Sequence, residues 1–196
     1  MPQWRAEARF LRALSYWLGV DLFGNIPLVE EDFTIGSTPP QQATRQQVFN
    51  FVEEELLAIT DGEGEENLPP AGQAEYGRAD RAAAWMLLSK LYLNAEEYIG
   101  QARYQEARQY AQRVIDAGFE LEPDYQHLFL ADNHTADGII FAIPHDGLNT
   151  QHFGGTQFLT HAAVGGELDP GAFGLDTGYN GLRIPSAGFN PFDSGD

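Results

Sequence analysis

The sequence predicts a mostly α fold, in which antiparallel helix pairs build a scaffold and a loop-rich segment follows. Over residues 1–143, apolar residues recur at intervals of three or four in four separate stretches, and breaks rich in glycine and proline divide these stretches. Residues 144–196 hold eleven glycines in 53 positions and keep no periodicity. We therefore expect a helical part over residues 1–143 and a Gly-rich loop segment over residues 144–196.

Composition excludes several functional classes. The 196 residues are 43% hydrophobic, which is enough for a buried core. The net charge of -18 argues against nucleic acid and anionic lipid as partners, because phosphate contacts need clustered Lys and Arg. The absence of cysteine excludes disulfides and thiolate metal sites. The chain has no apolar run long enough for a membrane span, and we expect no cofactor.

Acidic residues greatly outnumber basic ones, and lysine is nearly absent. Lys90 is the only lysine among 11 basic residues, against 29 acidic ones. Such a halophilic acidic surface is expected of a chain that works in concentrated salt, because ions screen its self-repulsion. An ordinary acidic surface is the alternative.

The first helix is predicted from Trp4 to about Leu18, ending at Gly19 or at Gly24 at the latest. Its expected apolar stripe consists of Trp4, Ala8, Leu11, Leu14 and Leu18. A turn over residues 24–27 and a short extended piece at residues 28–29 follow it.

The second helix is predicted to start at Thr44, where Gln47 completes a capping box. Its expected apolar stripe consists of Val48, Phe51, Val52, Leu56 and Ile59. Residues 61–70 are acidic and broken by glycine and proline, so we expect a solvated linker that does not pack.

Two further helices, over residues 80–97 and 102–117, fit a tetratricopeptide unit. The residues at its characteristic positions are Trp85, Leu88, Ser89 and Tyr92 in the first helix and Ala107, Ala111 and Val114 in the second. The first of the two is expected to be the most buried, and the second is expected to close at Gly118. A short helix is predicted over residues 125–130, and a buried strand is predicted over residues 138–143. An ordinary helical hairpin is the alternative to the repeat.

Several segments, in order, make the sequence similar to the SusD/RagB-like glycan-binding lipoproteins of the bacterial outer membrane. They are ARFLRALSYW at residues 8–17, LFGNIPLV at 22–29, VFNFVEEEL at 48–56, AAAWMLLSKLYL at 82–93, the stretch 104–118, YQHLF at 125–129 and IIF at 139–141. The resemblance implies a SusD-like, tetratricopeptide-like scaffold at residues 1–143, with residues 144–196 as the truncated start of the ligand-binding portion. It also implies a middle fragment of a longer protein, with a lipid anchor upstream.

The function implied by the resemblance is capture of a glycan at the extracellular face of the outer membrane. The glycan would then pass to a TonB-dependent, SusC-like transporter barrel, with no covalent chemistry. A protein-interaction scaffold that binds no sugar is the alternative, and a glycoside hydrolase is a more distant one.

Catalytic motifs are weak in this chain. The histidines show neither the HxH nor the HExxH spacing, so a metal site from His145, Asp146 and His152 is disfavoured against ordinary loop histidines. The many carboxylates form acidic runs that are typical of solvated faces rather than of a glycosidase pair.

Glycan binding needs exposed aromatic rings beside amide, carboxylate or guanidinium groups, because a sugar has an apolar C–H face and a rim of hydroxyls. The C-terminal segment supplies this mixture at Phe153, Gln157, Phe158, Phe173, Asp176, Tyr179, Asn180, Arg183, Phe189 and Asn190. The predicted ligand-binding residues are Phe153, Gln157, Phe158, Tyr179, Asn180 and Arg183. These aromatic residues would otherwise belong to a core shared with further chain.

Overall fold

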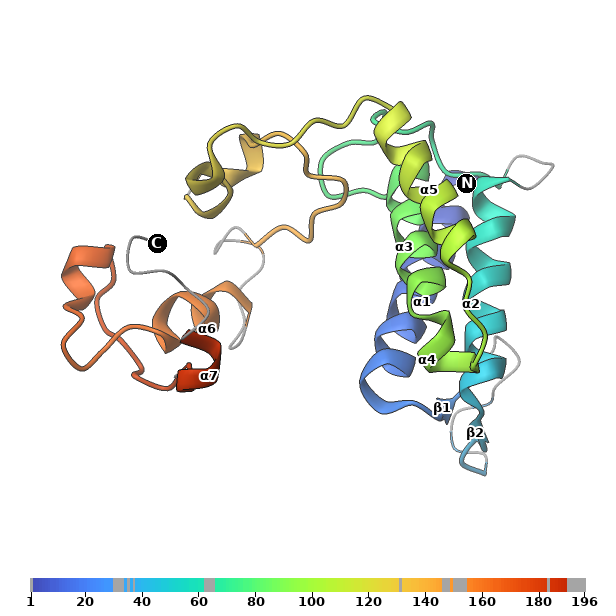
Figure 1. The fold of residues 1–196 in the computed structure, drawn as a ribbon, viewed down its shortest axis with the longest axis horizontal. Helices are drawn as coiled ribbons and strands as arrows, with labels where there is room; N and C mark the ends of the chain where they lie inside the picture. Colours follow the sequence, from blue (N-terminus) through green and yellow to red (C-terminus); the bar gives the residue numbers. More distant parts are fainter. Residues whose placement is uncertain are drawn as a thin grey trace. The chain divides into compact units, whose positions relative to one another are not determined.

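A computed structural model of the chain describes residues 2–29, 34, 36, 38–61, 66–130, 132–145, 149, 155–182 and 184–189. The chain divides into two compact units, Met1–Ala142 and Ile143–Asp196 (Figure 1). The mostly α fold is confirmed, since helices make up most of the first unit and the longest element of the second. Within the described residues, no helix is both long enough and apolar enough to cross a membrane.

The first unit begins with α1 (Pro2–Phe23), which packs against α2 (Arg45–Thr60). The predicted stripe of α1 is wrong, because Trp4, Leu11 and Leu18 are exposed. The buried face consists of Ala6, Phe10, Ala13 and Val20. Both faces have helical spacing, and the small residues of the buried one let α2 approach closely while Phe10 fills the core.

The start of α2 is confirmed in detail. Thr44 Oγ1 accepts from the backbone N–H of Gln47 at 3.3 Å, and the Gln47 side chain accepts from the Thr44 N–H at 2.9 Å. Before it, β1 (Ile26–Pro27) pairs antiparallel with β2 (Gln42–Ala43), so residues expected in a turn are in a short strand. Four of the five predicted core positions of α2 are buried, and Phe51 is half-buried.

The predicted third helix is broken in two. The structure has α3 (Arg81–Leu93) and a short α4 (Ala95–Ile99), separated at Asn94. The Asn94 side-chain amide donates to the carbonyl of Lys90 at 3.0 Å, a local bond that competes with continuation of the helix.

The tetratricopeptide-like pair consists of α3 and α5 (Tyr104–Asp116), which pack along one seam (Figure 1). Ser89 Oγ donates to the carbonyl of Ala107 at 2.9 Å across that seam. Tyr110, which is not among the predicted repeat positions, is buried and stacks on Tyr92 with ring centroids 5.7 Å apart. The helix closes at Gly118 as predicted, with a φ of 89°.

Two further expectations for this unit are wrong. Leu68, in the segment expected to stay solvated, is fully buried, and its N–H donates to the carbonyl of Ile59 at 2.9 Å. Residues 139–142 form no strand, although Phe141 reaches the core and meets the Phe10 ring edge-on at 5.1 Å. Hydrophobic contact with α1, rather than pairing with another strand, explains the apolar run.

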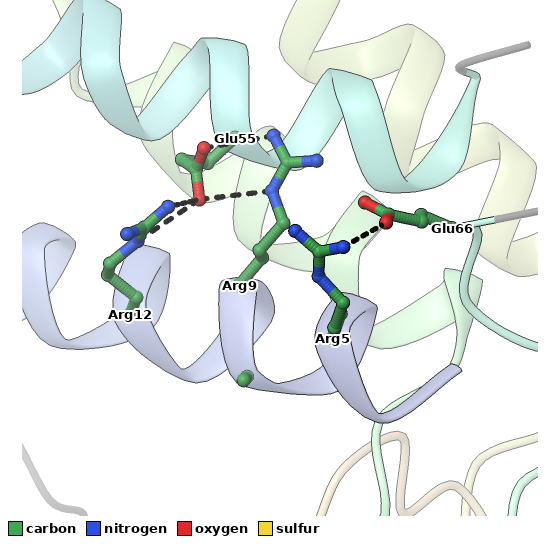
Figure 2. A pocket seen from close by; sticks show the side chains of 6 residues that line it. Arg5, Arg9, Arg12, Glu55 and Glu66 are labelled. Carbon is green, nitrogen blue, oxygen red and sulfur yellow. Dashed lines mark hydrogen bonds and ion pairs between the residues drawn. The ribbon is translucent and has the colours of Figure 1, made fainter. Parts of the chain in front are cut away.

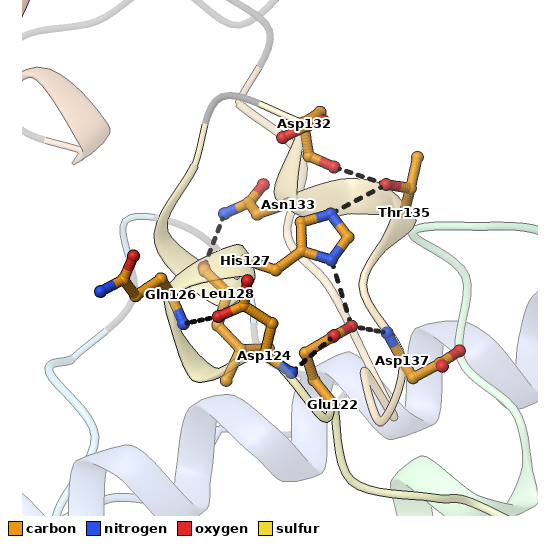
Figure 3. A network of polar contacts seen from close by, with 9 residues as sticks. All are labelled: Glu122, Asp124, Gln126, His127, Leu128, Asp132, Asn133, Thr135 and Asp137. Carbon is orange, nitrogen blue, oxygen red and sulfur yellow. Dashed lines mark hydrogen bonds and ion pairs between the residues drawn. The ribbon is translucent and has the colours of Figure 1, made fainter.

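A polar network holds the loop between α5 and residue 138 together (Figure 3). The loop contains η1 (Tyr125–Phe129), the short helix predicted there, and η2 (Asn133–Thr135). Glu122 accepts from the backbone N–H groups of Asp137 at 2.9 Å and Asp124 at 3.1 Å. These two bonds hold the pKa of the Glu122 carboxyl below its ordinary value.

The second unit contains α6 (Gly155–Ala162), η3 (Pro170–Phe173) and α7 (Ser186–Phe189). Its described buried apolar residues are Ala162 and Val164, so this unit has a small core. The expectation that its loops begin a ligand-binding portion stays a prediction.

Candidate functional site

The candidate site lies in the second unit, where residues 179–182 return to the C-terminal end of α6. The N–H of Tyr179 donates to the carbonyl of His161 at 2.8 Å, and the N–H of Asn180 donates to the carbonyl of Val164 at 2.9 Å. The N–H groups of Gly181 and Leu182 both donate to the carbonyl of Ala162, at 2.8 and 3.0 Å. Carbonyls that a helix end leaves unpaired thus fix the returning segment.

Glycine and asparagine allow this close return. A Cβ at Gly178 would lie 2.4 Å from the carbonyl oxygen of Val164, so no other residue fits without a shift of backbone. Asn180 has a φ of 52°, a left-handed conformation that asparagine tolerates better than most residues. Gly178 therefore allows the close backbone approach that positions Tyr179 beside α6.

Tyr179 and His161 form a stacked pair at this end of α6. Their ring centroids are 5.1 Å apart and their planes meet at 29°. The Tyr179 residue is 47% exposed, so the stack covers part of the ring and leaves the rest to solvent. His161 Nε2 lies 3.4 Å from Asp176 Oδ1, and its Nδ1 lies 3.0 Å from Thr160 Oγ1.

Phe158 adds a second exposed aromatic ring. It precedes His161 by three positions on α6, which places both residues on neighbouring positions of one helix face, and it is 48% exposed. This small unit therefore presents two aromatic rings, Tyr179 and Phe158, and the carboxylate of Asp176. The rings can stack on the apolar face of a ligand, and the carboxylate can accept hydrogen bonds from its hydroxyl groups.

Three of the six predicted ligand-binding residues have described side chains. These are Phe158, Tyr179 and Asn180, and all three are exposed. Phe153 and Arg183 lie outside the described residues, and for Gln157 only the backbone, within α6, is described. The assignment of all six to a ligand stays a prediction.

The histidines differ in their surroundings. His127 holds the loop of Figure 3, with Nδ1 3.2 Å from Glu122 Oε2 and Nε2 3.2 Å from Thr135 Oγ1. His134 meets the Tyr76 ring edge-on at 6.4 Å, and His145 is exposed. His152 and Asp146, from the disfavoured metal site, lie outside the described residues. Across the described part of the chain, no three His, Asp or Glu side chains gather as a metal site would require.

Sequence reasoning missed the part that His161 has in this site. The sequence assigns His161 no role, because the Gly-rich segment shows no lasting periodicity. The three-residue spacing of Phe158 and His161 is the one local sign of a helix here. It is weak because α6 is only eight residues long. The contact with Tyr179, 18 positions later, has no signature in the sequence.

Comparisons with known proteins agree on one family. No family model matches the chain. The chain is 39% identical over 159 residues to the starch-binding protein SusD of Bacteroides thetaiotaomicron, covering 79% of this chain and 27% of that protein. A SusD-like protein of Bacteroides ovatus is 29% identical, with 70% of this chain and 25% of the relative covered.

Solved structures show the same fold. A SusD superfamily protein of Bacteroides fragilis superposes with a TM-score of 0.64 at 18% identity, over 83% of this chain and 33% of that one. A surface glycan-binding protein A of Bacteroides uniformis gives a TM-score of 0.58 at 26% identity, over 71% of this chain and 30% of that one. The chain spans about a quarter of the length of the curated relatives it matches.

Proposed function

Because this chain belongs to the SusD-like family, we propose that it takes part in binding a glycan and carries out no covalent chemistry on it. The similar proteins support this by their names, since one is a starch-binding protein and another a surface glycan-binding protein. The observation that carries the proposal within the chain is the half-exposed Tyr179 ring, stacked on His161 with Phe158 on the same small unit.

The finer proposal concerns location and delivery. We propose that the whole protein works at the extracellular face of the outer membrane, held there by a lipid anchor, and passes its glycan to a TonB-dependent transporter barrel. The family resemblance supports this step. Deletion of the transporter that this proposal requires should leave glycan capture intact and abolish uptake.

The binding experiment is a glycan array followed by titration calorimetry on the full-length protein. We expect dissociation constants between micromolar and millimolar, about -8 to -4 kcal/mol, because such open sites bind through a few rings. Tyr179→Ala and Phe158→Ala should each weaken binding about three- to tenfold, as expected for loss of one stacking ring. Tyr125→Ala removes a more exposed aromatic ring from the other unit and should have no effect.

Each outcome has a clear meaning. Reducing sugars that accumulate with time would show an enzyme and overturn the non-catalytic proposal. Unchanged affinity in both aromatic variants, with unchanged helical circular dichroism, would move the glycan site away from α6. Failure of every glycan to bind would favour the alternative function below.

A protein-interaction scaffold is the second candidate, and one observation favours it. One face of α1 carries an apolar stripe whose members are all exposed: Trp4, Leu11, Leu18 and Leu22. An exposed apolar face of this kind is typical of a surface that contacts another protein segment. In this case Leu11→Ser should abolish capture of a protein partner and leave any glycan binding unchanged.

A further inference from the structure

An arginine-lined pocket lies between α1 and α2, in the first unit (Figure 2). Its volume is about 410 Å³, and its lining comprises Arg5, Ala8, Arg9, Arg12, Glu55 and Glu66. The three arginines occupy positions i, i+4 and i+7 of α1, so one face of the helix presents them all.

The buried carboxylate in this pocket is saturated by its two neighbours. Glu55 accepts from Arg9 Nη2 at 2.9 Å and from Arg12 Nη2 at 2.7 Å, and both Nε groups also donate to it. Arg9 still has donor capacity, because its Nη1 has no hydrogen-bond partner within the described part of the chain. One guanidinium therefore keeps N–H groups that a ligand can use.

The outer arginine is held only loosely. Arg5 Nη1 pairs with Glu66 Oε1 at 2.8 Å, but the side chains are 71% and 42% exposed. Exposed ion pairs of this kind contribute little to stability, because water and salt screen them. An incoming anion can therefore replace Glu66 at Arg5 without disturbing the fold.

Arginine is concentrated in this pocket. Among its described lining residues, three arginines lie beside two carboxylates, in a chain whose net charge is -18. The chain has only 11 basic residues, and three of them line this pocket. The pocket therefore attracts anions locally, whereas the net negative charge of the chain repels them.

We propose that this pocket binds the anionic group of an acidic sugar, a carboxylate or a sulfate ester, so that the glycan includes charged residues. Arginine donates to the oxygens of either group in a fork geometry. A sugar is favoured over a free ion because Trp4, one helical turn before the pocket residue Ala8, is 62% exposed and offers a ring for stacking. The inference rests on the proposed glycan binding and specifies its chemical class.

The test is calorimetry on the full-length protein with three probes of matched length: an oligogalacturonate, a sulfated galactan oligosaccharide and neutral maltohexaose. We expect one charged probe to bind at least tenfold more tightly than maltohexaose in low salt, and molar NaCl to remove that advantage. The oligogalacturonate and the sulfated probe distinguish a carboxylate ligand from a sulfate ligand.

Charge variants at the edge of the pocket make the test specific. Arg5→Gln should weaken the charged probe about tenfold, and Glu66→Gln should tighten it, because the second change removes the competing carboxylate. Arg108→Gln and Glu120→Gln alter the net charge equally at exposed positions of the same unit and should change affinity less than twofold. Neither Arg5 nor Glu66 supports Glu55, so these variants are expected to fold.

The outcomes separate this inference from the proposed function. Equal binding of charged and neutral probes, or equal effects of Arg5→Gln and Arg108→Gln, overturns the anionic pocket and leaves glycan binding in place. If maltohexaose and other neutral glycans bind through Tyr179 while charged probes are rejected, the inference alone fails. If no glycan of either kind binds, both fail.

Discussion

Among single residues, Glu55 is a buried carboxylate that is paired with two arginines. Its side chain is 10% exposed and lies between two arginines of α1, whose own side chains are 28% exposed (Figure 2). Burial raises the pKa of the Glu55 carboxyl, but the hydrogen bonds from Arg9 and Arg12 outweigh it and hold the pKa below its ordinary value of 4.5. This carboxylate therefore joins α1 to α2 while it stays ionised.

Removing the Glu55 charge should destabilise the helix pair. We expect Glu55→Gln to lower the free energy of unfolding by about 2–3 kcal/mol at pH 7, because two half-buried guanidinium groups lose their counter-charge. Urea unfolding followed by circular dichroism measures the change. Glu54→Gln, at an exposed neighbour, is the matched control and should change stability by less than about 0.5 kcal/mol.

The same variant has a defined pH dependence. A carboxyl whose pKa is lowered by folding contributes stability above its unfolded value of 4.5, and this contribution is lost as pH falls through the lower folded pKa. The difference between the native chain and Glu55→Gln should therefore be constant from pH 7 to about 5 and shrink as the pH falls below 4.5. An equal difference at pH 7 and pH 3 would contradict the ion-pair explanation.

At the scale of elements, helix ends and one seam organise the first unit. Asp80 caps α3, with its carboxylate accepting from the N–H groups of Ala82 at 2.8 Å and Ala83 at 3.1 Å. The same carboxylate accepts from the N–H of Gly72 at 2.6 Å, so it also ties the preceding loop to the helix. It is buried, whereas the corresponding cap of α2, Thr44, is exposed.

The two caps should therefore differ in energetic weight. Asp80→Ala should cost about 2–4 kcal/mol, because it removes a cap and leaves buried N–H groups without an acceptor. Thr44→Ala should cost about 1 kcal/mol, since water replaces the lost bond at an exposed helix end. Urea unfolding of both variants measures the difference, and equal costs would mean that Asp80 has no additional structural role.

The seam between α3 and α5 gives a second prediction at this scale. Trp85 is half-buried there and packs against the core, with the Arg113 guanidinium 5.8 Å from its ring centroid. Trp85→Ala should cost about 2–3 kcal/mol, less than the 3–5 kcal/mol typical of a fully buried aromatic ring. A thermal unfolding curve measures it. A loss below about 1 kcal/mol would remove Trp85 from the repeat packing.

At the scale of the whole molecule, charge is the dominant feature. Acidic residues number 29 and basic residues 11, so most carboxylates have no opposite charge to pair with. Self-repulsion of this size opposes the folded state, and ions screen it over about 10 Å at 0.1 M. Ion pairs such as Arg113–Asp61 weaken with salt too, but they are far fewer than the repulsive pairs.

We expect the melting temperature to rise with NaCl well beyond physiological concentration, because screening removes more repulsion than attraction. Differential scanning calorimetry from low to molar salt measures the shift. Sucrose, which stabilises by exclusion from the surface without screening charge, is the control. A flat or falling curve would mean that the acidic composition has no bearing on stability in salt.

Features encoded by neighbouring residues could be read from the sequence alone. The Thr44–Gln47 capping box, the closure at Gly118 and the helix that contains Ser89 follow from side chains within a few positions of one another. Each of these structures depends on bonds or spacings inside one turn or one helix, so the order of residues determines it. The SusD-like family, which rests on the order of several such segments, could be recognised for the same reason.

The tertiary structure alone decided which surfaces are buried and which side chains meet. Helix α1 has two apolar faces, and only contact with α2 selected Phe10 over Leu11 for the core. The sequence predicts a strand over residues 138–143, but a strand needs a partner with free backbone groups. Phe141 packs against the Phe10 ring instead. The Tyr179–His161 stack and the pocket around Glu55 join residues far apart in sequence. Such contacts depend on the shape that each element presents to another, and no local pattern of residues records that shape.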